Sequence, residues 1–251
     1  MAWSFVNLGA LGNANNAASV TAGLPASTIS NDLLVILAYS RDGSVRTPDL
    51  PAGWSEGARF DGGSTNGEIA LFYKVHDGSE ANTAVAFSGA GSSGVTEMVR
   101  MMAFRGNAIS SPLGDVGADS SWSAAQNIGP ITAVTLTTAG QLLLVCAARQ
   151  NDMNANTAGN SANVDVLSGD SQSWVEAMEW GATLGTDGGM VVDYAFTSGT
   201  PSITDKTFTN NNTTTAAGCG FMVAFKPLIT QLGSGPKIMI AKQAVKRGSL
   251  F

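Results

Sequence analysis

A segment of seven apolar residues occurs twice in this chain. Residues 32–40 read DLLVILAYS, and residues 141–149, 109 positions later, read QLLLVCAAR. Each apolar run is short, rich in branched aliphatic side chains and entered through polar or glycine-containing turns. A run of this kind indicates a strand buried on both faces rather than an amphipathic helix. We therefore expect each copy to lie at the centre of a sheet.

Further matches follow the two central segments in the same order. The spacing is 120 residues for one tryptophan pair and 121 for the later segments, so about twelve residues are inserted after the second central strand, in the Asn-, Ala-, Ser- and Gly-rich stretch 151–169. A period this long indicates a duplicated domain rather than a solenoid. The matches are Trp54 with Trp174, 69–73 with 190–194, 85–88 with 206–209, and 101–105 with 222–226.

The pattern predicts an all-β fold: two tandem, related antiparallel β-sandwich (jelly-roll-like) repeats and a C-terminal extended arm. Short apolar stretches separated by Gly, Asn, Asp and Pro turns are typical of sandwiches, and a helical period is almost absent. We assign the first repeat to 1–108, the second to 109–227 and the arm to 228–251. Two separate sandwiches and one merged sandwich both remain open.

The expected strands alternate with polar turns. Residues 13–16 read as a turn, and 47–54 as a rigid Pro- and Gly-containing loop that leads to Trp54. The expected strands are 3–10, 17–21, 32–40, 59–61, 68–76, 84–87 and 95–105, then 131–136, 142–148, 174–180, 190–196, 206–209 and 218–225.

Charge is sparse and unevenly placed. Charged residues make up 13% of the chain, and the net charge is -6 with a pI near 4.6. Residues 1–205 carry a net -12, whereas 206–251 carry six bases and no acid, a net +6. An acidic body argues against nucleic acid as a partner. The basic end is either a solvated tail or an arm that docks on an acidic partner surface; the arm's candidate contacts are Lys237, Lys242, Lys246, Arg247 and Phe251.

Neither a signal peptide nor a membrane span is expected. Residues 1–5 lack a charged and then apolar leader, and no apolar run approaches eighteen residues. Cys146 and Cys219 both fall in expected buried strands. We interpret them as small core residues without a disulfide.

The chain contains the short motifs DLLVILA (32–38), PAGW (51–54), LFYKV (71–75), AFRG (103–106) before Pro112, and VAFKP (223–227). These five motifs resemble those of a diffuse group of tailed-bacteriophage and prophage virion proteins with β-sandwich folds. The resemblance covers roughly residues 28–227 and implies a non-enzymatic structural protein without a cofactor, in the first place a capsid decoration, cement or head-fibre protein, with a tail-associated role as the other option. It further implies the major capsid protein or other virion proteins as partners, homo-oligomers, no contact with nucleic acid or membrane, and a location in the virion after assembly in the host cytoplasm.

Sites of catalysis or metal binding are weakly indicated. His76 is the single histidine, so histidine-dependent catalysis would have to pass through it, and we expect an inert surface side chain. Residues 89–94 fit a Gly-x-Gly-x-x-Gly dinucleotide pattern but precede an expected strand rather than a helix, so we interpret them as a turn. Asp61 and Asp187 lie in Asp-Gly-Gly turns, and we predict no metal site.

Residues 174–180, WVEAMEW, form the strongest candidate binding motif. On a regular strand Trp174, Glu176 and Trp180 share one face and Glu179 lies on the other. The shared face is a possible glycan platform, in which tryptophans stack on sugar rings beside a carboxylate. Two acids on opposite faces argue against a glycosidase, which needs a pair that flanks one bond, unless Glu176 and another acid meet in space. The alternative function is therefore a tail or fibre module that binds a host-surface glycan, and the purely structural interpretation is a set of core or interface tryptophans.

Overall fold

The computed structural model describes residues 2–151, 172–182, 187–209 and 214–228. Within these ranges the chain forms antiparallel sheets, and the single helix, α1 (Gly63–Asn66), is four residues long. No described helix is long and apolar enough to cross a membrane. The predicted all-β sandwich fold is confirmed.

The first half of the chain forms a six-stranded sheet. Its order is β1-β9-β4-β7-β6, and β2 pairs with a second part of β9. The predicted central strand is β4, which pairs with β7 on one side and β9 on the other over its whole length. The strands are β1 (Ser4–Leu8), β2 (Gly12–Asn15), β4 (Leu33–Ser40), β6 (Ser55–Asp61), β7 (Glu68–Val75) and β9 (Thr96–Arg105).

The second half forms a six-stranded sheet with a matching order. It runs β10-β17-β13-β15-β14, with β11 paired to β17, so β13 takes the central place of β4. This common order supports a duplication, which stays a prediction. The strands are β10 (Leu113–Val116), β11 (Ser120–Ala125), β13 (Leu142–Arg149), β14 (Val175–Ala182), β15 (Gly188–Phe196) and β17 (Ala216–Phe225).

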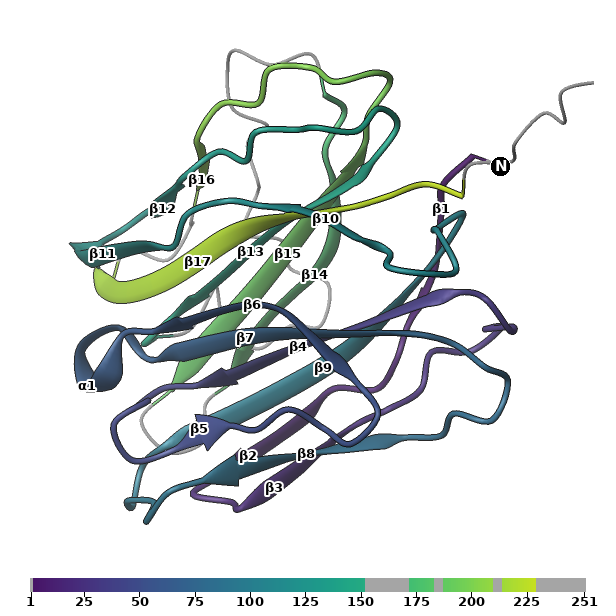
Figure 1. Cartoon of the computed structure of the whole chain (residues 1–251). Coiled ribbons are helices and arrows are strands. Elements are labelled where there is room, and N and C mark those ends of the chain that lie inside the picture. Colours follow the sequence, from purple (N-terminus) through teal and green to yellow (C-terminus); the bar gives the residue numbers. More distant parts are fainter. Residues whose placement is uncertain (1, 152–171, 183–186, 210–213, 229–251) are drawn as a thin grey trace, which may run out of the picture.

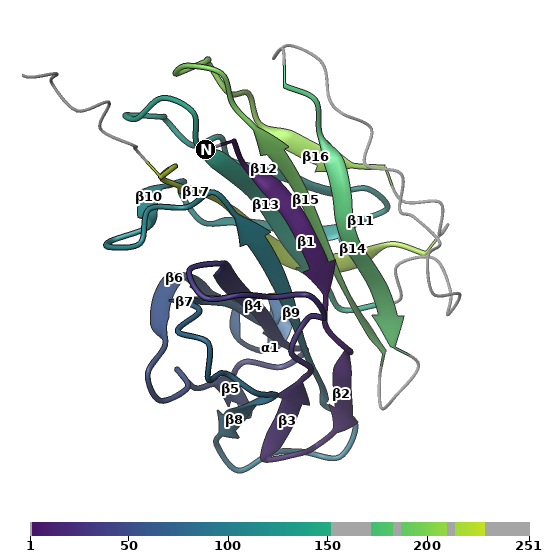
Figure 2. The same cartoon turned by 90° about the vertical axis from the view of Figure 1, so that its right-hand side faces the viewer.

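Two small sheets cover the outer faces of the large ones (Figures 1 and 2). One consists of β3 (Ser19–Ala22), β8 (Thr83–Ser88) and β5 (Thr47–Pro48), and the other of β12 (Ile128–Ile131) and β16 (Lys206–Phe208). Because strand side chains alternate between faces, β4 sends Leu34 and Ile36 toward its small sheet and Leu33 and Val35 toward the other half. Every residue of β4 and β13 is buried, as expected for strands covered on both sides.

The two large sheets pack face to face over a core that both halves share. This shared core contains Leu37 and Phe104 from the first sheet and Leu144 and Phe221 from the second. At one side of the stack, Phe5 of β1 lies against Tyr194 of β15 with ring centroids 5.4 Å apart. The two halves therefore merge through their inner faces.

Residues at equivalent positions meet across this shared core. Arg41 and Gln150 are 109 positions apart, the spacing of the two central strands, and they bond reciprocally. The Arg41 Nε donates to the Gln150 carbonyl at 3.3 Å, and the Gln150 Nε2 donates to the Arg41 carbonyl at 2.9 Å. A contact in which each partner repeats the other's role is the pattern of a two-fold interface.

Several details differ from the sequence predictions. The predicted turn at 13–16 falls largely in β2, because Gly12 to Asn15 pair with Val99 to Thr96 of the long strand β9. The strand predicted at 131–136 ends at Ile131, and β10 and β11 were not predicted. β10 and β11 are polar strands at the edge of their sheet, so they lack the apolar run by which a central strand is recognised in the sequence. Cys146 and Cys219 are buried free thiols, as predicted.

Candidate functional site

At one end of the stack, residues 106–108 and 226–228 are joined by two backbone hydrogen bonds and one β-bridge. The chain passes from the first half to the second here, and the Leu228 amide donates to the Gly106 carbonyl at 2.6 Å while the Ala108 amide donates to the Lys226 carbonyl at 2.9 Å. Asn107 and Pro227 form an isolated antiparallel bridge between these bonds. The predicted arm, 228–251, therefore begins at a fixed point on the body.

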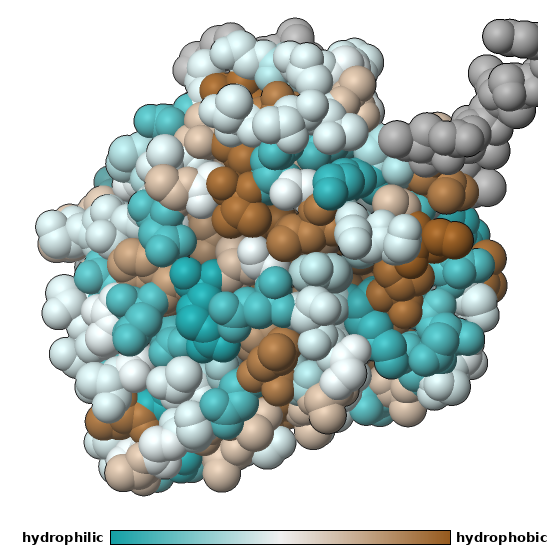
Figure 3. All heavy atoms as spheres, viewed as in Figure 1, coloured by the Kyte–Doolittle hydropathy of each residue, from teal (hydrophilic) through white to brown (hydrophobic). Residues whose placement is uncertain are grey.

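An apolar groove of about 380 Å³ opens at this end. Ile29 and Ile109, two of the large apolar side chains that the fold leaves exposed, are 55% and 58% exposed. Figure 3 shows apolar atoms gathered at the right-hand end of this face. A contiguous exposed apolar cluster usually marks a surface that binds another molecule. The groove is lined by Ile29, Ser30, Asn31, Asp32, Arg105, Gly106, Asn107, Ile109 and Leu228.

A bidentate ion pair forms one wall of the groove. The Arg105 Nε and Nη2 donate to the two carboxylate oxygens of Asp32 at 2.7 and 2.9 Å, and Asp32 is 1% exposed. The same carboxylate accepts a bond from the Ile29 amide at 2.9 Å. Its bond to Arg105 raises the pKa of the guanidinium. The ion pair thus fixes the loop that presents Ile29.

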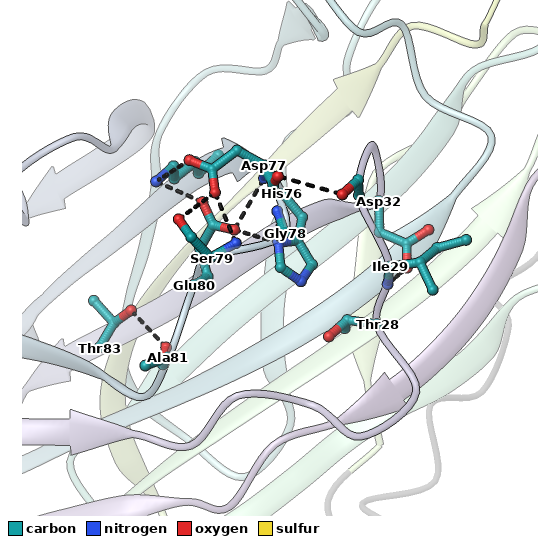
Figure 4. Close-up of polar contacts among 12 residues, drawn as sticks. Thr28, Ile29, Asp32, His76, Asp77, Gly78, Ser79, Glu80, Ala81 and Thr83 are labelled. Atoms are coloured by element: carbon teal, nitrogen blue, oxygen red, sulfur yellow. Dashed lines mark hydrogen bonds and ion pairs between the residues drawn. The ribbon is translucent and has the colours of Figure 1, made fainter.

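His76 lies beside the groove in a cluster of polar side chains (Figure 4). It is 5% exposed, so the expectation of a surface histidine is wrong: the loop 76–82 folds over the ring. Ligand atoms of His76, Asp77 and Glu80 all lie within 4.8 Å of one another. This arrangement offers the atom types that bind divalent metals.

The atoms of this cluster are already engaged by the protein. Glu80 contacts the His76 Nδ1 and the Lys74 ammonium, and it accepts a bond from the Asp77 amide at 2.9 Å. Asp77 accepts bonds from the Ser79 amide and hydroxyl, which lower its pKa to about 2. Lys74 supplies the positive charge that a metal would bring. The contacts therefore account for the cluster as a locked turn between β7 and β8.

The predicted glycan platform is not assembled. Trp174 belongs to the apolar cluster on the outer face of the second sheet, whereas Trp180 packs on the core between the two large sheets. A β-bulge between Glu176 and Met178 explains the error, because the extra residue reverses the alternation beyond it. The shared face predicted for Trp174 and Trp180 is wrong.

The same bulge brings acids together. Glu176 pairs with Asp193, and Glu179 pairs with Val191, which faces the outer cluster. Burial and then the charge of Glu176 raise the pKa of Asp193 to about 8. Burial, followed by the charges of Glu176 and Asp193, raises the pKa of Glu179 to about 8. Placing Glu176 and Glu179 on opposite faces was therefore wrong. Asp193 and Glu179, each with a pKa of about 8, hold a proton at neutral pH.

Two other predictions concern loops and the arm. The glycine-rich residues 89–94 lead into strand β9, with positive φ angles at Gly89, Gly91 and Gly94, in agreement with a turn. Asp61 ends β6 and Asp187 precedes β15. The arm residues Lys237, Lys242, Lys246, Arg247 and Phe251 lie outside the described residues.

Comparisons with family models, curated proteins and solved structures found no match to this chain.

Proposed function

We propose that this chain is a structural protein of a bacteriophage particle, a capsid decoration, cement or head-fibre protein that binds the shell. The groove between Ile29 and Ile109 carries the proposal, because Leu228, the first residue of the predicted arm, forms part of its wall. A partner that binds the beginning of this segment also covers the groove. The protein then attaches by burying the apolar surface of the groove, at one end of the sandwich, against the partner.

The charges define the partner surface. Residues 229–251 contain Lys237, Lys242, Lys246 and Arg247 and no acid. These bases favour an acidic face, and the apolar residues 238–240 between the first two lysines favour an apolar seat within it. We propose the major capsid protein as this partner. The virion motifs at 32–38 and 223–227 support the same assignment.

Removal of residues 229–251 is expected to abolish binding to particles that lack the protein. The truncated chain keeps both large sheets and the shared core, so its unfolding midpoint should stay within a few degrees of the full chain's. Co-sedimentation of the purified protein with particles measures binding, and thermal unfolding monitored by circular dichroism reports the fold. Undiminished binding by the folded, truncated chain would refute the role of the segment.

The groove is tested by a matched pair of substitutions. Ile109→Asp places a charge in the apolar contact, and we expect it to weaken particle binding about tenfold or more. Val116→Asp makes the same change on β10 at a side chain that is 44% exposed outside the groove, and binding should stay unchanged. Equal losses in the two variants would argue against the groove as the contact.

The second candidate is a tail or fibre module that binds a host-surface glycan. Trp180 and Glu176 favour it, because both line a cavity at the side of the stack. Trp174 takes no part in this cavity. Binding of sugars in the absence of any particle binding would move the assignment to this candidate.

A further inference from the structure

Arg100 interrupts the apolar inner face of β9. It pairs with Leu37 of β4, and its neighbours on the same face, Met98 and Met102, belong to the shared core. At the equivalent place in the second half, Cys146 pairs with Phe221, which is fully buried. The first half therefore has a guanidinium where the second half has an aromatic ring. A charged residue that breaks a consistent apolar pattern is a candidate functional group.

The fold leaves most of this guanidinium unused. The Arg100 Nε donates to the Gly9 carbonyl at 3.2 Å, and neither Nη atom has a hydrogen-bond partner or an ion pair among the described residues. Burial lowers the pKa of Arg100, and no carboxylate among those residues offsets this effect. A half-buried guanidinium without a counter-ion destabilises the folded state.

Arg100 lines a cavity of about 260 Å³ between the two large sheets. Leu8 and Arg100 come from the first sheet, and residues 176–180 of the edge strand β14 form the opposite wall. Met178 and Trp180 make part of that wall apolar. The cavity thus combines a guanidinium, which can donate two parallel hydrogen bonds, with an apolar surface.

We propose that this cavity binds an acidic sugar unit, with its carboxylate on the Arg100 guanidinium. Two parallel N–H donors match the two oxygens of a carboxylate, and the pair excludes neutral ligands because only an anion replaces the missing counter-charge. The ring of the sugar lies against Met178 and Trp180. This assignment is independent of the proposed attachment to the capsid.

The wall opposite Arg100 selects the rest of the ligand. Residues 176–180 form this wall. Glu176 and Glu179 pair with Asp193 and Val191 on the outer side of the sheet, and neither carboxylate offsets the effect of burial on Arg100. A ligand with both a carboxylate and a ring contacts Arg100 and the apolar side chains of Met178 and Trp180, whereas a simple carboxylate such as acetate contacts Arg100 alone.

Titration of the full chain with sodium glucuronate, followed by NMR or calorimetry, tests the proposal. We expect binding of glucuronate, at least tenfold weaker binding of acetate, and none of methyl glucoside, which has the ring without the carboxylate. Arg100→Met, which keeps the length of the side chain, should weaken glucuronate binding at least tenfold. It should also raise the unfolding midpoint, because an uncompensated charge is removed.

Arg105→Met is the matched control. Arg105 is engaged by Asp32 outside the cavity, so this variant should bind glucuronate like the unchanged chain and lose stability. Equal glucuronate affinity of the Arg100→Met variant and the unchanged chain, or no binding at millimolar glucuronate, would overturn the assignment. Equal affinities for acetate and glucuronate would overturn the sugar as the ligand.

Discussion

Replacement of Asp193 by asparagine is expected to stabilise this protein strongly at pH 8 and to flatten the dependence of its stability on pH. Asp193 is 2% exposed on β15, and one of its carboxylate oxygens has no hydrogen-bond partner among the described residues. Burial, with a smaller contribution from the charge of Glu176, raises its pKa to about 8. Asparagine keeps the shape of the side chain and removes its titration.

The sign follows from the two pKa values. An aspartate in the unfolded chain titrates near pH 4, so between about pH 4 and pH 8 the folded protein holds a proton that the unfolded chain has lost. The free energy of unfolding then falls by about 1.4 kcal/mol for each pH unit over this window. Above pH 8 both states are ionised and the fall ends. The full effect of Asp193 is on the order of 5 kcal/mol at pH 8.

Urea unfolding at several pH values between 5 and 8.5 measures this prediction. Glu179 titrates in the same direction, with its pKa also raised to about 8, so the substitution should remove about half of the slope. Asp77→Asn is the control, because the pKa of Asp77 is lowered to about 2 and its contribution to stability is lost only in acid, below about pH 4. A slope unchanged by Asp193→Asn would contradict a buried, protonated aspartate.

The two halves are expected to be unable to fold separately. Residues 1–108 expressed alone would expose the inner face of the first sheet, including Leu37, Leu71 and Phe104, which the second half covers in the intact chain. Burial of a large apolar side chain contributes about 2 kcal/mol. Ten first-half residues belong to the shared core, so the loss is on the order of 20 kcal/mol, more than the 5–15 kcal/mol by which a domain is usually stable.

Expression of 1–108 and 109–228, separately and together, measures this dependence. Each fragment alone should aggregate or bind a hydrophobic dye and show no cooperative unfolding. The fragments expressed together should form a complex that unfolds in one transition, because reciprocal bonds such as those between Arg41 and Gln150 join them. A monomeric 1–108 fragment with cooperative unfolding would show that the first sandwich is complete without the second.

The central strands and the fold class could be predicted from the sequence because their signal is local. A seven-residue apolar run such as 33–39 has one stable placement, between two other layers, and its recurrence at 142–148 predicts a second sheet of the same kind. The interpretation of Trp174 as a core residue agrees with its burial. Burial of apolar surface is the main driving force of folding, so the sequence pattern that reports it is the most reliable.

The candidate sites could not be predicted because they depend on local irregularity and on contacts between the halves. One inserted residue at the β14 bulge separates Trp174 from Trp180 and joins Glu176 to Glu179. The cavity at Arg100 needs both sheets, so no single repeat contains it. One signal was present in the sequence: alignment of the repeats at a spacing of 121 places Arg100 opposite Phe221. A charged residue in one half, at the position where the other half has a buried aromatic residue, departs from the apolar pattern that the two halves otherwise share.

Electron cryo-microscopy of the intact particle to which we propose this chain belongs tests the proposed function most directly. We predict density of this size on the outer surface of the shell, at symmetry axes or between capsomers. The groove end of the protein, marked by Ile29 and Ile109, should face the major capsid protein. Density on the tail alone would contradict the capsid role and favour host recognition, and absence of the protein from the particle would contradict a virion function altogether.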